Sequence, residues 1–413
     1  MEQLSGRLLL LSSILGLVLL SLSPLVFWPG WGDVWNDPQI FLINLGLLIL
    51  VGSHLLKQAL AAPQGASATS WSFEYLRSGF RNKDLWTFRA MYQFMVESPA
   101  RLLGIAAILL LIQAIALGIF SPQTLALSLA LFLAGLVLSP KFRFEGQRSL
   151  LFDLVAVSIS LQGLLVLVQF FIGDPIPYGN FTDFVKWRAT GTLGNPNRVG
   201  TFLSLGLLFL LNSDLPQSWL RKLAVGIAVL ALACTLSRAN ISVLLLLWLW
   251  DHWRKGRWTI KRALRLGLIP VIAFLLVVMG SSTSEVFSSL GNVGSLVGRL
   301  NEYKVVIPML SEVHPLWGMG WNQYGQLPGA SSPHIHNEFL GAWIEGGAIG
   351  LVLLCLLTIS FFKLSFSRKG PALFMLIFLL TISLVDFPLR NQANLVLLVL
   401  ACLRPSNPSD LAA

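Results

Sequence analysis

The segment 331–350, "SSPHIHNEFLGAWIEGGAIG", places titratable side chains at the start of a long apolar run. It holds two of the five histidines in the chain, and the full polar set is His334, His336, Asn337, Glu338 and Glu345. The apolar run predicts a helix whose positive dipole end lies beside His336. That end favours neutral imidazole, which is suited to act as a general base near pH 7. The position of His336 therefore suits a general base.

The two acids of this segment are expected on one helix face, because Glu338 and Glu345 are seven residues apart. Glu345 would lie about 12 Å down the helix. A carboxylate at that depth needs a partner, and it could orient a catalytic group or pin the helices together. His334 and His336 could also bind a metal, but Ser331, Ser332 and Pro333 include no typical third ligand. We predict no metal and no cofactor.

Arginines occur in four further polar motifs. The first is "RATGTLGNPNRVG" (188–200), which contains Arg188, Asn195 and Arg198. The other three are "SRAN" (237–240) with Arg238, "GRLNEYK" (298–304) with Arg299 and "DFPLRNQ" (386–392) with Arg390. Each motif has a simpler interpretation as a turn or helix start, or as an arginine that extends toward lipid headgroups. The guanidinium fork is suited to phosphate, so arginines gathered on one face would predict a phosphorylated or diphosphate ligand.

The composition predicts an all-α polytopic membrane protein. The 413 residues are 55% hydrophobic and only 12% charged, with mean hydropathy +0.73, whereas soluble proteins carry about a quarter charged residues. A net charge of +10 fits cytoplasmic loops better than nucleic-acid binding, and the three cysteines lack metal-like spacing. Twelve spans are predicted, at roughly 7–27, 39–60, 101–119, 122–138, 149–172, 197–212, 220–236, 239–253, 263–280, 337–362, 370–386 and 390–404.

The distribution of basic residues predicts that both termini face the cytoplasm. With that orientation most of the 29 Lys and Arg lie inside, as the positive-inside rule requires. The few outside cations are Lys186, Arg188, Arg198, Arg238, Arg299, Lys304 and Arg390. We expect residues 1–413 to form a single membrane domain. It would have a cytoplasmic loop at 61–100 that includes an interfacial amphipathic segment, and a large periplasmic loop at 281–336.

Four stretches, in order along the chain, resemble the bacterial superfamily of O-antigen ligases and polymerases, which also contains protein O-oligosaccharyltransferases. They are "GTLGNPNRVG", "TLSRANISVLL", "GRLNEYKVVIPMLSEVHPLWGMGWNQYG" and "PHIHNEFLGAWIEGGAIG", within residues 188–350. The resemblance implies a membrane-embedded glycosyltransferase of the bacterial inner membrane. By the family pattern His336 would be the base, Arg188 and Arg299 would bind diphosphate, and Arg238 would help. Arg198 and Arg390 are added from topology.

The resemblance also implies the partners. A glycan would move from undecaprenyl diphosphate to an acceptor hydroxyl on the periplasmic side, in a metal-independent, inverting reaction. The acceptor could be lipid A–core (a ligase), a second lipid-linked glycan (a polymerase) or a protein, and the residues do not separate these. A lipid-glycan flippase or transporter is the competing class. Its usual repeated halves are not evident in this sequence.

Overall fold

The computed structural model describes residues 2–26, 37–61, 99–119, 122–139, 142, 148–173, 188–212, 218–254, 294–327, 335–368, 371–386 and 388–403. The expected span at 263–280 and the loop at 61–100 lie outside these ranges, apart from the residues at the ends of the loop. Within the described residues every regular element is helical, as the composition predicts. The α-helices are α1 (Glu2–Leu22), α2 (Asp37–Ala61), α5 (Pro99–Ala116), α6 (Pro122–Leu138), α7 (Arg148–Phe171), α9 (Pro196–Leu211), α10 (Trp219–Cys234), α11 (Arg238–Arg254), α14 (Gly294–Met309), α15 (Glu338–Arg368), α16 (Pro371–Ser383) and α17 (Gln392–Ala401). Short 3₁₀ turns are η1 (Ser23–Leu25), η4 (Gly191–Leu193), η5 (Tyr324–Gln326) and η6 (Pro388–Arg390).

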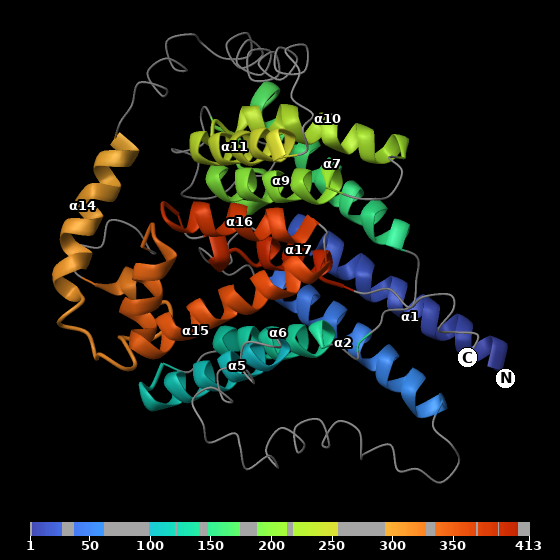
Figure 1. Ribbon diagram of the computed structural model, residues 1–413, viewed down its shortest axis with the longest axis horizontal. Coiled ribbons are helices and arrows are strands. Elements are labelled where there is room, and N and C mark those ends of the chain that lie inside the picture. Colours follow the sequence, from blue (N-terminus) through green and yellow to red (C-terminus); the bar gives the residue numbers. More distant parts are fainter. Residues whose placement is uncertain are drawn as a thin grey trace.

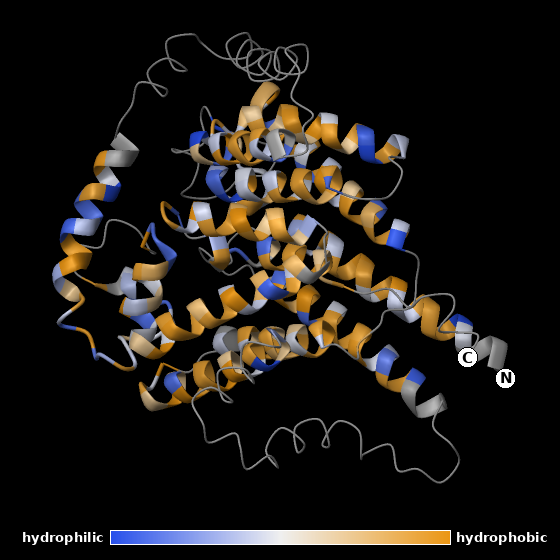
Figure 2. Cartoon of the chain, viewed as in Figure 1, coloured by the Kyte–Doolittle hydropathy of each residue, from blue (hydrophilic) through white to orange (hydrophobic). Residues whose placement is uncertain are grey.

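Five helices are long and apolar enough to cross a membrane: they contain Gly6–Leu25, Gln39–Lys57, Pro99–Ala116, Arg148–Phe171 and Glu338–Phe366. Shorter apolar helices include α6, α9 and α16. These findings confirm an α-helical membrane protein. The number of twelve spans and the side that each terminus faces stay predictions. Figure 2 shows that most helices of the bundle are predominantly apolar, whereas α14 carries more hydrophilic residues.

The helices pack side by side in a bundle, and α9, α16 and α17 lie in its interior (Figure 1). Every residue of α9 from Val199 to Leu210 is buried, so this helix is covered on all sides. Glycines permit the closest approach between helices: a Cβ on Gly16 would lie 2.9 Å from the Gly46 carbonyl oxygen across the α1–α2 contact. Large apolar side chains such as Leu8, Phe41 and Ile115 remain exposed on the outer helices, as expected for a surface that faces lipid.

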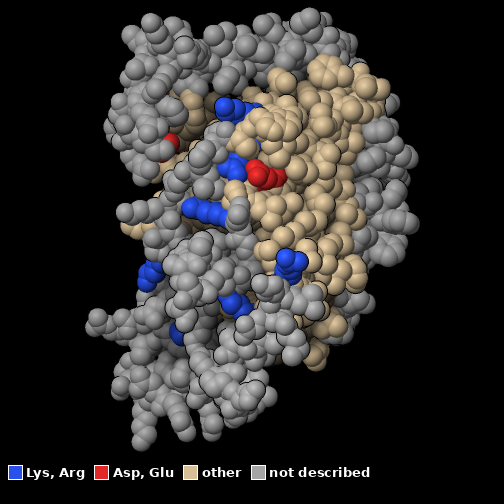
Figure 3. Space-filling view, turned by 90° about the vertical axis from the view of Figure 1, so that its right-hand side faces the viewer, with Lys and Arg blue, Asp and Glu red and all other residues tan. Residues whose placement is uncertain are grey.

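Side-chain contacts define two ends of this bundle. At the first, called the basic end, α1, α7 and α10 begin and α2 ends; His54 of α2 lies 4.8 Å from Phe142 there, ring centroid to ring centroid. Figure 3 looks toward this side of the molecule, and basic side chains are far more common than acidic ones on its described surface. This distribution is consistent with the positive-inside rule.

The opposite end, called the motif end, consists of residues 188–195, 235–240, 335–338 and 384–391. Helices α7, α10 and α16 end here, and α9, α11, α15 and α17 begin here. The chain leaves helical geometry at each of these connections, so backbone groups must find other partners. Three of the four arginine motifs and the described start of the histidine segment therefore lie at one end of the bundle, whereas the motif 298–304 lies on α14.

The expected periplasmic loop at 281–336 contains a helix of its own. Helix α14 lies to one side of the bundle, beside the beginning of α15 (Figure 1). Val306 of α14 is buried with Tyr324, Ile335 and Ile344 in a small apolar cluster apart from the main core. This second cluster anchors α14 next to the histidine segment.

The basic end is held by an ion pair whose arginine is buried. Arg221 of α10 donates from Nε to Asp153 Oδ1 of α7 at 2.9 Å and from Nη2 to the Ser149 carbonyl at 3.0 Å. Its side chain is only 3% exposed and lies over the ring of Phe152, 5.4 Å from the centroid. A buried guanidinium with these partners fixes the register of α10 against α7.

We expect Arg221→Met to lower the thermal midpoint of the detergent-purified protein, with a loss of about 1–3 kcal/mol, because Asp153 and the Ser149 carbonyl lose their donor. Lys222→Met is the matched control, since Lys222 is the exposed neighbour on the same turn. Equal midpoints for the two variants would contradict a stabilising role of the pair.

Candidate active site

Asn197 links two of the sequence motifs at the motif end. Its Oδ1 accepts hydrogen bonds from Arg188 Nη2 at 2.9 Å and from Ser237 Oγ at 3.1 Å. Asn240 Nδ2 donates to the Asn197 carbonyl at 2.9 Å. Asn195 caps α9, accepting from the backbone N–H of Asn197 at 2.8 Å. The "GNPN" and "SRAN" motifs therefore fold as one unit, and Asn195 shapes it through a capping contact.

The segment that carries Arg188 is fastened to α7 by amide side chains. Gln169 Oε1 accepts from the backbone N–H groups of Thr190 at 3.1 Å and Gly191 at 2.7 Å. Gly191 has φ +57°, and a Cβ there would lie 2.2 Å from Gln162 Nε2. Thr192 Oγ1 lies 2.9 Å from Gln162 Oε1. Lipid offers no hydrogen-bond partners, so in an apolar bundle these amide side chains supply them to the non-helical segment.

Arg188 is held against two backbone carbonyls. Its Nε donates to the Thr235 carbonyl at 2.9 Å and its Nη2 to the Leu236 carbonyl at 3.5 Å. Burial lowers the pKa of Arg188 to about 10, with further lowering by Arg238 and Arg299 and an opposing effect of Asp386. Arg188 is therefore still charged at neutral pH. Arg238 and Arg299 therefore both lie within electrostatic reach of Arg188.

Asp386 is the acidic partner of this arginine cluster. Its Oδ2 lies 3.7 Å from Arg299 Nη2, and both side chains are mostly buried, 14% and 19% exposed. Asp386 also acts on the charge of Arg188, whereas Arg238 and Arg299 both add positive charge near Arg188. The structure therefore brings Arg238 and Arg299 near Arg188, with positive charge in excess; the phosphate ligand stays a prediction.

His336 lies between α14 and α15, two residues ahead of Glu338, where α15 begins. Its Nδ1 lies 3.0 Å from Glu302 Oε2, and its backbone N–H donates to the same oxygen at 3.0 Å. The Tyr303 hydroxyl donates to the His336 carbonyl at 3.0 Å. The His336 side chain is 27% exposed, whereas that of Glu302 is 1% exposed.

Tyr303 connects the histidine to the arginine cluster. Burial raises the pKa of its hydroxyl; the Asn337 side chain and Arg299 lower that pKa, and Glu302 and Asp386 raise it. Each of these groups is therefore close enough to Tyr303 to act on its charge. The candidate base and the guanidinium groups belong to one site.

Asn337 and Glu338 serve the local fold of this site. Asn337 Oδ1 accepts from the backbone N–H groups of Phe339 and Leu340, both at 3.0 Å, and so caps α15. Its Nδ2 donates to the Leu384 carbonyl at 3.1 Å. Glu338 Oε1 accepts from the backbone N–H of Leu389 at 2.8 Å. Both residues tie the start of α15 to the segment that carries Asp386.

Glu345 stabilises a break in α15. The helix kinks at Gly347, which has φ +62°. The carbonyls of Ile344 and Glu345 accept from the backbone N–H groups of Met319 and Gly320 at 2.9 and 3.0 Å. In return the Ala348 N–H donates to the Pro315 carbonyl at 2.8 Å. The loop thus replaces the helical hydrogen bonds that the kink removes.

The carboxylate of Glu345 completes this loop contact. It is 1% exposed, and its Oε2 accepts from the Asn322 backbone N–H at 3.0 Å. Gln113 of α5 donates to the Glu345 carbonyl at 2.7 Å. The sequence left open whether Glu345 orients a catalytic group or pins the bundle; the structure gives it a pinning contact.

The remaining predicted residues lie as follows. Arg198 is half-buried in the first turn of α9, and Arg238 is exposed at the first residue of α11. Arg390 ends η6, but its side chain lies outside the described part of the structure. His334 lies outside it altogether. In the described ranges no group of three or more His, Cys, Asp or Glu could hold a metal.

Sequence reasoning missed the acidic partners. Glu302 and Asp386 both stand inside the quoted motifs "GRLNEYK" and "DFPLRNQ", and each lies three or four residues from an arginine of the same motif. A search for a carboxylate to balance each candidate cation or base could have found them. Gln169 and Gln113 gave no such signal, because a single amide in an apolar run has many structural roles.

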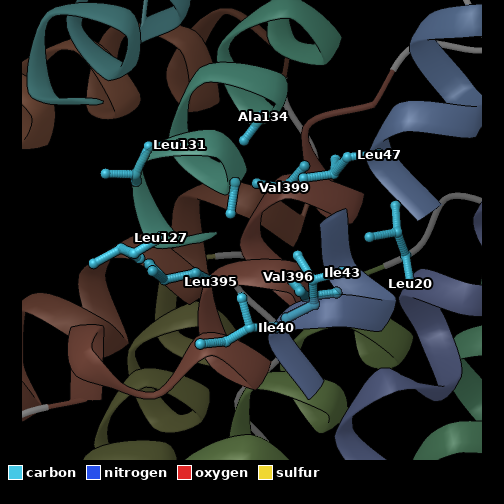
Figure 4. A pocket seen from close by; sticks show the side chains of 11 residues that line it. Leu20, Ile40, Ile43, Leu47, Leu127, Leu131, Ala134, Leu395, Val396 and Val399 are labelled. Carbon is cyan, nitrogen blue, oxygen red and sulfur yellow. The ribbon is translucent and has the colours of Figure 1, made fainter. Parts of the chain in front are cut away.

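An apolar pocket lies within the bundle, lined by α1, α2, α6 and α17 (Figure 4). Its walls are entirely hydrophobic side chains, from Leu20, Ile40, Ile43, Leu47, Leu127, Ala130, Leu131, Ala134, Leu395, Val396 and Val399. Leu20 and Ile40 stand near the ends of α1 and α2 where η1 begins. Pro24 of η1 accepts a hydrogen bond from Thr192 of the arginine-bearing segment at 2.6 Å. The pocket thus starts near the motif end.

Comparison with known families gives a match over part of the chain. Residues 223–355 match the family model described as O-antigen ligase. These residues form a domain of the O-antigen ligase superfamily. The match, about a third of the chain, runs from α10 past the kink in α15 and contains Arg238, Arg299 and His336. Arg188 and Asp386 lie outside the matched residues and join them only through the tertiary structure.

No curated protein matches the chain. Membership of the O-antigen ligase superfamily nevertheless places the chain among glycosyltransferase-type membrane enzymes of the ligase and polymerase kind. In this O-antigen ligase family member the arginine cluster and His336 are the groups at the motif end that suit such chemistry.

Gly347→Ala should reduce both thermal stability and activity of this O-antigen ligase family member. A Cβ there would lie 2.4 Å from the Leu316 carbonyl carbon and oxygen, at a φ that disfavours side chains. We expect a cost of about 1–3 kcal/mol. Gly346→Ala is the control, because a Cβ there meets nothing within 4 Å. Matching melting curves for the two variants would show that the kink is not required.

Proposed function

We propose that this protein transfers a glycan from undecaprenyl diphosphate to an acceptor hydroxyl on the periplasmic side of the bacterial inner membrane. An O-antigen ligase type of reaction is the form we favour. The observation that carries the proposal is the arginine cluster of Arg188, Arg238 and Arg299 beside His336. Its net positive charge matches a diphosphate, and His336 can accept the proton of a hydroxyl.

The lipid part of the donor suits the rest of the molecule. An undecaprenyl chain is an apolar polymer that stays in the bilayer, so its diphosphate would reach the arginines at the level of the motif end. The apolar pocket of α1, α2, α6 and α17 offers a hydrocarbon surface that starts near this level (Figure 4). In this proposal the motif end faces the periplasm, and residues 1–413 form one membrane domain.

The reaction is a direct displacement. The acceptor oxygen attacks the anomeric carbon while its proton moves to His336. The bond between that carbon and the diphosphate oxygen breaks, and its electron pair leaves with the diphosphate. Negative charge therefore grows on the leaving group, and the arginines stabilise it more in the transition state than in the ground state. Attack opposite the leaving group inverts the anomeric centre.

We expect His336→Ala to abolish release of undecaprenyl diphosphate by the purified protein in detergent. The assay supplies a mixed pool of undecaprenyl-diphosphate oligosaccharides, with lipid A–core, a second lipid-linked glycan or a pilin-like protein as acceptor in separate tubes. EDTA in parallel tubes tests metal dependence. The acceptor that supports release separates ligase, polymerase and protein-directed activity.

His54→Ala is the control for His336→Ala, since His54 lies toward the basic end of α2, away from the motif end. Equal release by wild type and His336→Ala would exclude His336 as the base. No release by wild type with any acceptor would favour a transporter instead.

Arg299→Lys keeps the charge but loses the planar fork that pairs with two phosphate oxygens. We expect transfer to slow by roughly 10- to 1,000-fold, a loss of about 1.4–4 kcal/mol of transition-state stabilisation. Arg7→Lys, at an exposed position near the start of α1, is the matched control. Wild-type rates in Arg299→Lys would argue against a diphosphate clamp at this residue.

A further inference from the structure

Glu302 is an unusual acid for its surroundings. It stands on α14, one helical turn before Val306, and faces the small apolar cluster that also contains Tyr324, Ile335 and Ile344. The side chain is 1% exposed. Its Oε1 is buried and has no hydrogen-bond partner among the described residues. A carboxylate in such a position is costly unless a donor or a positive charge compensates it.

That compensation comes from His336. Glu302 Oε2 accepts from the backbone N–H of His336 and lies 3.0 Å from its Nδ1. An ionised carboxylate can only accept hydrogen bonds, so Nδ1 must carry the hydrogen that it donates to Oε2. The neutral ring then has its lone pair on Nε2, which is the atom able to take a proton. The carboxylate thus selects one of two tautomers.

Other groups around the pair support this assignment. The Tyr303 hydroxyl holds the His336 carbonyl at 3.0 Å, so the backbone on both sides of the ring is fixed. Burial raises the pKa of Tyr324 to about 12, and the negative charge of Glu302 contributes to this rise. Tyr324 is therefore a neutral neighbour of Glu302 at neutral pH. Arg299, one turn earlier on α14, is paired with Asp386.

We propose that Glu302 is the positioning residue of the base: it holds His336 in the Nδ1–H tautomer and stabilises the imidazolium that forms when Nε2 takes the acceptor proton. This role adds a residue to the mechanism of the proposed glycan transfer, and it rests on that proposal. The proton passes from the acceptor hydroxyl to Nε2 and later to solvent, while the hydrogen on Nδ1 stays with the ring. A carboxylate behind a catalytic histidine acts in this way in hydrolase triads.

The first arm of the test does not depend on activity. Nitrogen-15-labelled histidine in the purified protein reports which ring nitrogen carries hydrogen, and comparison with His336→Ala assigns the signal. We expect Nδ1–H for His336 in wild type and in Glu312→Gln, and a shift toward Nε2–H in Glu302→Gln. Glu312 is the matched control, an exposed glutamate on the turn after α14. An Nε2–H signal in wild type would overturn the proposal.

The second arm measures transfer. We expect Glu302→Gln to lower kcat by about 10²-fold, within the range of general-base contributions, and to leave KM for the lipid donor within about twofold. Glu302→Asp keeps the charge but shortens its reach, so we expect partial recovery of kcat. If Glu302→Gln does not fold, Glu302→Asp takes its place in the comparison of kcat with Glu312→Gln. A buried residue with only a structural role would change protein yield and melting instead of kcat alone.

The outcomes separate this inference from the proposed function. If His336→Ala is inactive and Glu302→Gln matches Glu312→Gln in kcat and in tautomer, Glu302 does not position the base, and the glycan-transfer proposal stands. If His336→Ala transfers glycan like wild type, the proposed mechanism fails, and the role of Glu302 in catalysis fails with it. The tautomer signal then still reports whether Glu302 fixes the ring.

Discussion

The concentration of positive charge at one end of an apolar bundle is the constraint on which the rest of the structure depends. Arg188, Arg238 and Arg299 repel one another, and burial lowers the pKa of Arg188 further. Such a cluster persists only where acceptors hold each guanidinium in place. The acceptors at Arg188 are the carbonyls of Thr235 and Leu236, which are available because the chain is not helical there. The site thus exists where the helices end.

Non-helical backbone in a membrane protein needs its own partners, and this chain supplies them from neighbouring helices. Gln169 satisfies the segment that carries Arg188, and Gln113 together with the loop before η5 satisfies the kink of α15. Polar side chains that look isolated within apolar runs are therefore the supports of the site. Their cost in the bundle is offset by backbone groups that would otherwise have no partner.

The two halves of the candidate active site come from different parts of the chain. The arginine half combines the segment before α9, the start of α11 and α14, while the histidine half joins α14 to the start of α15. Helix α14 contributes to both, through Arg299 and Glu302. In the proposed reaction this single helix would set the distance between the leaving group and the base. The contact of Glu338 with the backbone of Leu389 adds the segment of Asp386 to the same frame.

The sequence by itself determined the class of the molecule. Hydropathy requires apolar helices, and the apolar run after His336 predicts the helix start there; the cap at Asn337 was found in the structure. The sequence also identified the arginine motifs, because the few cations predicted on the outer side lie in short polar motifs. Only the tertiary structure decided which charges meet. Glu302 and His336 are 34 residues apart, and Arg188 acts on Asp386 across almost half of the chain. Contacts of this kind depend on how α14 and the helix ends pack, which no local pattern of residues encodes.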